Sequence, residues 1–160
     1  MSDSSPARDD QSEADDEKPI ADPEEAAAPA RRLLLVDDDE HILRSLKIYL
    51  EMEDFNVTTA SSGREALDKI RADQPELVVL DVMMPEMDGF QVLETVKGDE
   101  ATRKIPVIML TARGQDADVL RGYQKGASSY MTKPVNYDEL VDNIRLIFDN
   151  EENDAKSGKS

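Results

Sequence analysis

Residues 77–89 read LVVLDVMMPEMDG, an apolar run that ends in an acid and is followed by a turn containing Pro and Gly. Four consecutive apolar residues predict a strand buried on both faces, and the Pro and Gly predict that the chain leaves the strand there. Asp81 is therefore expected at the carboxyl end of a buried strand, where it opens a loop. In open parallel sheets, ligands bind at this end of the strands.

Three further apolar runs end in polar residues in the same way. They are LLLV at 33–36 before Asp37-Asp38-Asp39, VIML at 107–110 before Thr111, and a shorter run at 130–132 before Lys133-Pro134. If these strands are parallel neighbours, acids, a hydroxyl and an ammonium meet at one edge of the sheet.

Segments with helical periodicity separate the apolar runs. They are 40–51, 63–72, a segment carrying Phe90, Leu93 and Val96, another carrying Val119, Leu120 and Tyr123, and 136–148, which Asn136 caps with Glu139 three residues later. The run Asn56–Ala60 is the most polar strand, which favours an edge position. Five alternations of strand and helix predict an α/β fold of (βα)5 type, a doubly wound, five-stranded parallel sheet with helices on both faces.

Composition restricts the partners and the location of the chain. Its 160 residues carry a net charge of −17, and a surface this acidic repels nucleic-acid phosphates and anionic lipid, so no nucleic-acid partner is expected. A helix needs about 20 consecutive apolar residues to cross a bilayer, and no apolar stretch in this chain approaches that length. No membrane insertion is therefore expected. The absence of Cys excludes disulfides and thiolate metal sites and is compatible with the cytoplasmic location that we predict.

The ends of the chain differ in composition from its middle. Residues 1–30 carry ten acids and two bases and few large apolar residues, which predicts a disordered acidic N-terminal tail, either solubilising or a docking arm. Residues 31–150 form the predicted domain, and 151–160 are predicted to be a disordered C-terminal tail. The residues after the last predicted helix are too few for an output domain, which leads us to expect a protein that acts alone.

The three acids Asp37, Asp38 and Asp81 need a cation if they share one edge. Two carboxylates about 4 Å apart repel by roughly 4 kcal/mol at an effective dielectric near 20. Carboxylate ligands with positions left for water and phosphate suit Mg²⁺. With the Lys133 ammonium and the Thr111 hydroxyl nearby, the set predicts a cradle for a phosphoryl group carried on a carboxylate nucleophile.

These residues stand in five motifs that together resemble one family. The motifs are Val36-Asp37-Asp38, residues 80–89, Leu110-Thr111-Ala112, Gly126-Ala127 and Lys133-Pro134. In this order, over 33–148, they resemble the response regulator receiver domain of two-component signalling, of the stand-alone, chemotaxis-regulator-like kind. The resemblance implies a flavodoxin-like fold with strand order 2-1-3-4-5.

The resemblance also implies a role for each matching residue. Asp81 accepts phosphate as an aspartyl phosphate, Asp38 and Asp81 bind Mg²⁺ directly, Asp37 binds it through water, and Met83 binds it through its backbone carbonyl. Thr111 and Lys133 bond the phosphoryl oxygens, Tyr130 is an aromatic switch coupled to Thr111, and the Lys133-Pro134 peptide is cis. Met83 and Arg113 lead us to expect slow self-dephosphorylation.

The implied function is phosphorelay signalling rather than enzymatic turnover. The donor would be a histidine kinase or a histidine phosphotransfer protein. Phosphorylation would then change how the face made by the last two helices and the last strand binds an effector protein, in a monomer or weak dimer.

Other readings of the same residues stay open at this point. Asp37-Asp38 alone are also good helix caps, Asp39 and Glu40 suit the first helical turn, and His41 is expected on the outer surface of its helix. Met83, Met84 and Met87 are interpreted as packing the loop, with a docking surface as the alternative. For the whole chain, the alternatives are a receiver-shaped scaffold that works without phosphate and a haloacid-dehalogenase-type phosphohydrolase using Asp37-x-Asp39.

Overall fold

The computed structural model describes residues 30–112 and 121–156. Several sequence predictions therefore lie outside the described residues: those for 1–29, Arg113, Val119, Leu120 and 157–160.

In the described residues, five parallel strands form one sheet. The strands are β1 (Arg32–Val36), β2 (Asn56–Ala60), β3 (Leu77–Asp81), β4 (Val107–Thr111) and β5 (Ser129–Thr132), in the order β2-β1-β3-β4-β5. Every residue of β3 and β4 is buried, whereas β2 at the edge alternates between buried and exposed positions. The predicted fold class, the strand order and the edge position of 56–60 are confirmed.

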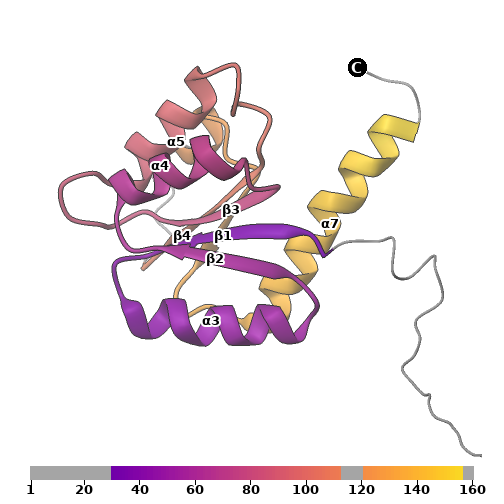
Figure 1. The fold of residues 1–160 in the computed structure, drawn as a ribbon, viewed down its shortest axis with the longest axis horizontal. Helices are drawn as coiled ribbons and strands as arrows, with labels where there is room; N and C mark the ends of the chain where they lie inside the picture. The colour runs from indigo at the N-terminus through magenta and orange to yellow at the C-terminus, as the bar shows by residue number, and fades with distance from the viewer. Residues whose placement is uncertain (1–29, 113–120, 157–160) are drawn as a thin grey trace, which may run out of the picture. The chain divides into compact units, whose positions relative to one another are not determined.

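Helices cover both faces of this sheet, as predicted. Helices α4 (Gly63–Asp73) and α5 (Gly89–Gly98) lie on one face, and α3 (Glu40–Met52) and α7 (Tyr137–Lys156) lie on the other (Figure 1). Residues 121–124 are also helical. Among the described helices, none has the length together with the apolar composition that crossing a bilayer requires.

Two apolar clusters, one on each side of the sheet, form the core. Alternate strand residues enter opposite clusters: Leu34 and Val36 pack toward α4 and α5, whereas Leu33 and Leu35 pack toward α3 and α7. This burial on both faces explains why the strands are apolar at successive positions rather than at every second one.

Helices α3, α4, α5 and α7 each begin where a polar side chain satisfies backbone N–H groups that have no partner within the helix. Asp39 caps α3, Ser62 caps α4, and Asp88 caps α5 with a reciprocal bond from Gln91. Asn136 Oδ1 accepts a hydrogen bond from the N–H three residues later at 2.9 Å, so the predicted cap of α7 is confirmed.

Helix α7 is longer than predicted. The apolar periodicity stops at Phe148, but the helix continues to Lys156, so the predicted helix end was wrong and the domain boundary drawn at 150 falls inside α7. The guanidinium of Arg31, just before β1, lies 3.8 Å from the centroid of the Phe148 ring and forms ion pairs with Glu151 and Glu152. These contacts with Arg31 stabilise the last turns of α7, although the residues of those turns show no apolar periodicity.

Candidate functional site

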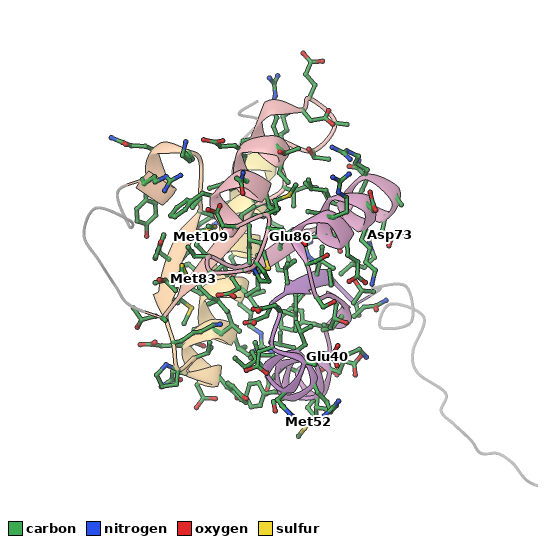
Figure 2. The ribbon with its side chains drawn as sticks, turned by 90° about the vertical axis from the view of Figure 1, so that its left-hand side faces the viewer. Glu40, Met52, Asp73, Met83, Glu86 and Met109 are labelled. Atoms are coloured by element: carbon green, nitrogen blue, oxygen red, sulfur yellow. The ribbon has the colours of Figure 1, made fainter. Side chains whose placement is uncertain are left out.

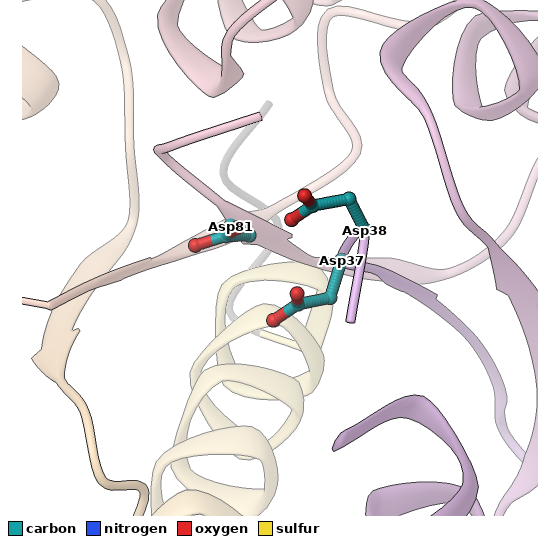
Figure 3. Close-up of side chains that lie close together, drawn as sticks. All are labelled: Asp37, Asp38 and Asp81. Carbon is teal, nitrogen blue, oxygen red and sulfur yellow. The ribbon is translucent and has the colours of Figure 1, made fainter. Parts of the chain in front are cut away.

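Three carboxylates meet at the carboxyl ends of two adjacent strands. Asp37 and Asp38 directly follow β1, Asp81 is the last residue of β3, and β1 pairs with β3. One carboxylate oxygen from each residue lies within 4.8 Å of the others (Figure 3). Asp37 and Asp81 are each only 2% exposed, whereas Asp38 is exposed. The structure thus brings together the three acids that the sequence predicted to meet.

Lys133 reaches this cluster from the end of β5. Its Nζ lies 2.8 Å from Asp37 Oδ2 and 3.1 Å from Asp81 Oδ1. The approach to Asp37 Oδ2 has the distance of an ion pair but not the direction of a hydrogen bond. The other oxygen, Asp37 Oδ1, accepts the N–H of Asp39 at 2.9 Å. The peptide between Lys133 and Pro134 is cis, as the resemblance implied.

The pKa shifts at the site show that the ammonium of Lys133 does not fully offset the negative charge of the carboxylates. Burial, followed by the charge of Asp37, raises the pKa of Asp81 from 3.8 to about 6, against the opposing effects of Lys133 and of the Met83 backbone N–H. For Lys133, burial lowers the pKa, but the interactions of its ammonium with the Asp37 and Asp81 carboxylates outweigh it, so its pKa is raised overall. A further cation would therefore be favourable at this edge.

The donor set fits Mg²⁺ or a similar hard cation. Among the described residues, Asp37, Asp38 and Asp81 are the acids close enough to one another to share an ion. All three offer oxygen, and the exposed Asp38 leaves the site open to solvent and to a phosphate. The repulsion that raises the pKa of Asp81 is the repulsion that a bound dication would relieve.

The methionines of the loop after β3 do not behave alike. Met84 is buried and Met87 packs against the core, which confirms the packing interpretation for these two. The Met83 side chain is 68% exposed, on the same loop as Glu86 (Figure 2). Its backbone N–H favours the charged form of Asp81 and so lowers the pKa of that carboxyl. The use of its carbonyl as a metal ligand stays a prediction.

Thr111 and Tyr130 lie on adjacent strands and the same face of the sheet. Thr111 is the last residue of β4 and is buried, and its carbonyl accepts the Lys133 N–H at 2.6 Å. Tyr130 on β5 pairs in register with Met109 and is half-buried. Its ring lies 6.3 Å from that of Tyr123. The phosphate-binding and switch roles of Thr111 and Tyr130 stay predictions.

The position of Asp39 bears on one alternative, the haloacid-dehalogenase-type phosphohydrolase. Asp39 Oδ1 accepts the N–H groups of His41 and Ile42, so Asp39 is the cap of α3 rather than a member of the cluster. Asp37-x-Asp39 is therefore not a pair of site carboxylates, and the phosphohydrolase reading loses its main motif. His41 is exposed, as expected.

Sequence reasoning missed the residues that hold the site through backbone packing. A Cβ on Gly89 would lie 2.4 Å from the Asp81 carbonyl oxygen, so α5 begins in direct contact with the end of β3. The Asp88-x-x-Gln91 pattern is a local signal that could have marked this helix start. The close approach itself has no sequence signal, because it depends on how α5 packs on the sheet.

Comparison with known sequences identifies close similarity over the folded unit. The sequence pattern of the family described as "Response regulator receiver domain" matches residues 33–145. Transcriptional regulatory protein CpxR of Escherichia coli K12 is 47% identical over 116 residues, which are 72% of this chain and 48% of that protein. The DNA-binding dual master transcriptional regulator RpaA of Synechocystis is 40% identical over 116 residues, with the same coverages of 72% and 48%. The chain thus spans about half the length of the curated relatives it matches.

Solved structures agree with the sequence comparison. A CheY-like response regulator receiver domain protein from Methanospirillum hungatei superposes with a TM-score of 0.74 at 32% identity, covering 78% of this chain and 98% of that one. The Vibrio cholerae chemotaxis protein CheY4 gives a TM-score of 0.69 at 30% identity, with coverages of 73% and 98%. The flavodoxin-like architecture expected from the sequence is confirmed.

Proposed function

The chain belongs to the response regulator receiver family, and from that premise we propose that Asp81 accepts a phosphoryl group from a phosphohistidine. The donor is a histidine kinase or a histidine phosphotransfer protein. The observation that carries this proposal is the buried Asp81 carboxylate, with Asp37 and Asp38 beside it and the Lys133 ammonium 3.1 Å from Oδ1. A receiver turns over no separate substrate, so the chain is a signalling module rather than an enzyme.

In the proposed transfer, an Asp81 carboxylate oxygen attacks phosphorus in line with the phosphohistidine nitrogen. A P–O bond forms to Asp81, the P–N bond breaks, and its electron pair stays on the imidazole nitrogen, which is then protonated. The attack requires ionised Asp81, and a pKa of about 6 leaves mostly carboxylate at neutral pH. Lys133 orients that carboxylate before transfer and stabilises phosphoryl charge during it.

A metal site completes the proposed centre. Asp38 and Asp81 would hold Mg²⁺ through their side chains, Met83 through its carbonyl, and Asp37 through water. When bound, the ion supplies positive charge that stabilises the transferring phosphoryl oxygens. The exposure of Asp38 supports this assignment, because a phosphodonor must reach the same edge of the sheet.

The phosphorylated state is proposed to act on partners through the β5 and α7 surface. Thr111 bonds a phosphoryl oxygen, and Tyr130 changes its position with it, which shifts the population between two arrangements. In the described part of this surface, Tyr123 is 48% exposed and Leu146 is 57% exposed. Leu146 lines a groove of about 490 Å³ between β5 and α7, which suits contact with an effector protein.

Intact mass spectrometry after incubation with acetyl phosphate and Mg²⁺ tests the proposed function. We expect one added phosphoryl group that disappears without Mg²⁺ and in Asp81→Asn, while Asp68→Asn on the exposed face of α4 is modified like the wild type. Failure of the wild type with both acetyl phosphate and phosphorylated histidine proteins would overturn the proposal in favour of the phosphate-independent scaffold.

A further inference from the structure

The loop between β3 and α5, residues 82–88, is held by its backbone at both ends. The Val82 N–H donates to the Leu110 carbonyl at 2.8 Å, and the Gly89 N–H donates to the Val82 carbonyl at 2.8 Å. These bonds fix where the loop leaves Asp81 and where it enters α5. They do not fix the residues between, among them Met83.

Met83 is positioned by its neighbours and not by its own side chain. That side chain is 68% exposed, whereas its backbone N–H, two residues after Asp81, acts on the Asp81 carboxylate and lowers the pKa of that group. Two other methionines anchor the same loop: Met84 is 8% exposed in the core beneath α4 and α5, and Met87 is partly buried against that core. The position of the Met83 backbone therefore depends on how Met84 and Met87 pack.

Met87 packs against Gly63, the first residue of α4. A Cβ added to Gly63 would lie 2.9 Å from Met87 Cγ, 3.0 Å from its Cβ and 3.0 Å from its carbonyl oxygen. Contacts between non-bonded heavy atoms are optimal at about 3.5–4.0 Å. Any side chain at position 63 would thus displace Met87 and the loop that carries it.

We propose that Gly63 is a positioning residue for phosphorylation: its lack of a side chain lets Met87 pack against α4, and this packing fixes the position of the Met83 backbone beside Asp81. The inference rests on the proposed function, because it concerns the efficiency of the same site. It links α4, which contributes no side chain to the acidic cluster, to the phosphoacceptor at the end of β3.

The requirement at position 63 is steric and not conformational. Among the described glycines, Gly126 has positive φ and Gly63 does not. Alanine is the best helix former and is compatible with the first position of α4. The effect of Gly63→Ala therefore arises from contact with Met87. Relief of that contact requires a shift of about 0.5–1 Å, in a centre where about 1 Å of misplacement can reduce a rate 100-fold.

Gly98 provides a matched control. It lies at the end of α5, is exposed, and has no heavy atom within 4 Å of an added Cβ. Gly98→Ala makes the same chemical change in a helix without displacing a neighbour. We expect it to leave Mg²⁺ binding and phosphorylation unchanged.

The experiment compares the wild type, Gly63→Ala, Met87→Ala, the double variant and Gly98→Ala in the full chain. Mg²⁺ affinity is measured by calorimetry, and the phosphorylation rate is measured by intact mass over a range of acetyl phosphate concentrations. Gly63→Ala is expected to weaken Mg²⁺ binding and slow phosphorylation about tenfold, the range of residues that orient metal ligands indirectly. Met87→Ala removes the same packing contact from the side of the loop, so the double variant is expected to lose clearly less than the sum of the two single losses, a non-additivity that a general loss of stability would not produce.

Each outcome separates this inference from the proposed function. A wild type that takes up no phosphate overturns both. An active wild type with an equally active, folded Gly63→Ala overturns the inference alone, as does a double variant whose loss equals the sum of the two single losses. If Gly63→Ala does not fold, Met87→Ala provides the test. The inference requires Met87→Ala to weaken Mg²⁺ binding and to slow phosphorylation, because the packing of the loop against α4 is lost. Wild-type values for Met87→Ala would overturn the inference.

Discussion

Replacing Asp81 by Asn removes the phosphoacceptor and also a buried negative charge that opposes folding. Asn has nearly the same volume as Asp and needs no proton to be neutral. Asp81 is 2% exposed, and Asp37 beside it is equally buried. In metal-free protein we therefore expect Asp81→Asn to unfold at a higher temperature than the wild type.

The size of this gain follows from the pKa of Asp81, which burial and then the charge of Asp37 raise from 3.8 to about 6. In the folded protein the carboxyl binds its proton more tightly than in the unfolded chain. Stability from this group is thus fully present below about pH 4 and is lost as the pH rises through about 6. At about 1.4 kcal/mol per pKa unit, ionised Asp81 lowers the free energy of unfolding by about 3 kcal/mol above pH 7.

Thermal unfolding in EDTA at several pH values measures this effect. Asp81→Asn is expected to exceed the wild type by about 5–10 °C at pH 7.5, with a difference that shrinks toward zero at pH 4. Asp68→Asn, exposed on α4, is expected to change the free energy of unfolding by less than about 0.5 kcal/mol. A lower melting temperature for Asp81→Asn at pH 7.5, or a gain that does not vary with pH, would refute the electrostatic reasoning.

Three further outcomes are expected from the same structure. Mg²⁺ at about 100 times its Kd should stabilise the wild type by about 2.7 kcal/mol and Asp81→Asn by clearly less; equal shifts in thermal unfolding would contradict the metal assignment. Lys133→Met leaves the carboxylates of Asp37 and Asp81 without their ammonium, so it should destabilise metal-free protein by about 3 kcal/mol in denaturant unfolding, and a stability within error of the wild type would count against the ion pairs. Arg31→Ala loses the contact with the Phe148 ring at 3.8 Å and should lower the free energy of unfolding by about 1–2 kcal/mol. The control Lys47→Ala breaks an exposed ion pair within α3 and should lower the free energy of unfolding by less than about 0.5 kcal/mol. Similar losses for the two variants would argue against the Arg31 contacts.

The sequence by itself determined the fold class, the strand order through the family resemblance, and the residues that meet at the site. Strands buried on both faces must be apolar at consecutive positions, so runs such as 77–80 are visible without a structure. Because parallel strands end at one edge, the polar residues after those runs predict the cluster of Asp37, Asp38 and Asp81.

Only the tertiary structure decided the distances and the supports of the site. The ammonium of Lys133 meets Asp37 from 96 positions along the chain, and no local pattern encodes its 2.8 Å separation. The last turns of α7 and the close approach of Gly63 to Met87 are likewise set by neighbours distant in sequence. Periodicity records which face of an element is buried, whereas the atoms it meets depend on how the elements pack against one another.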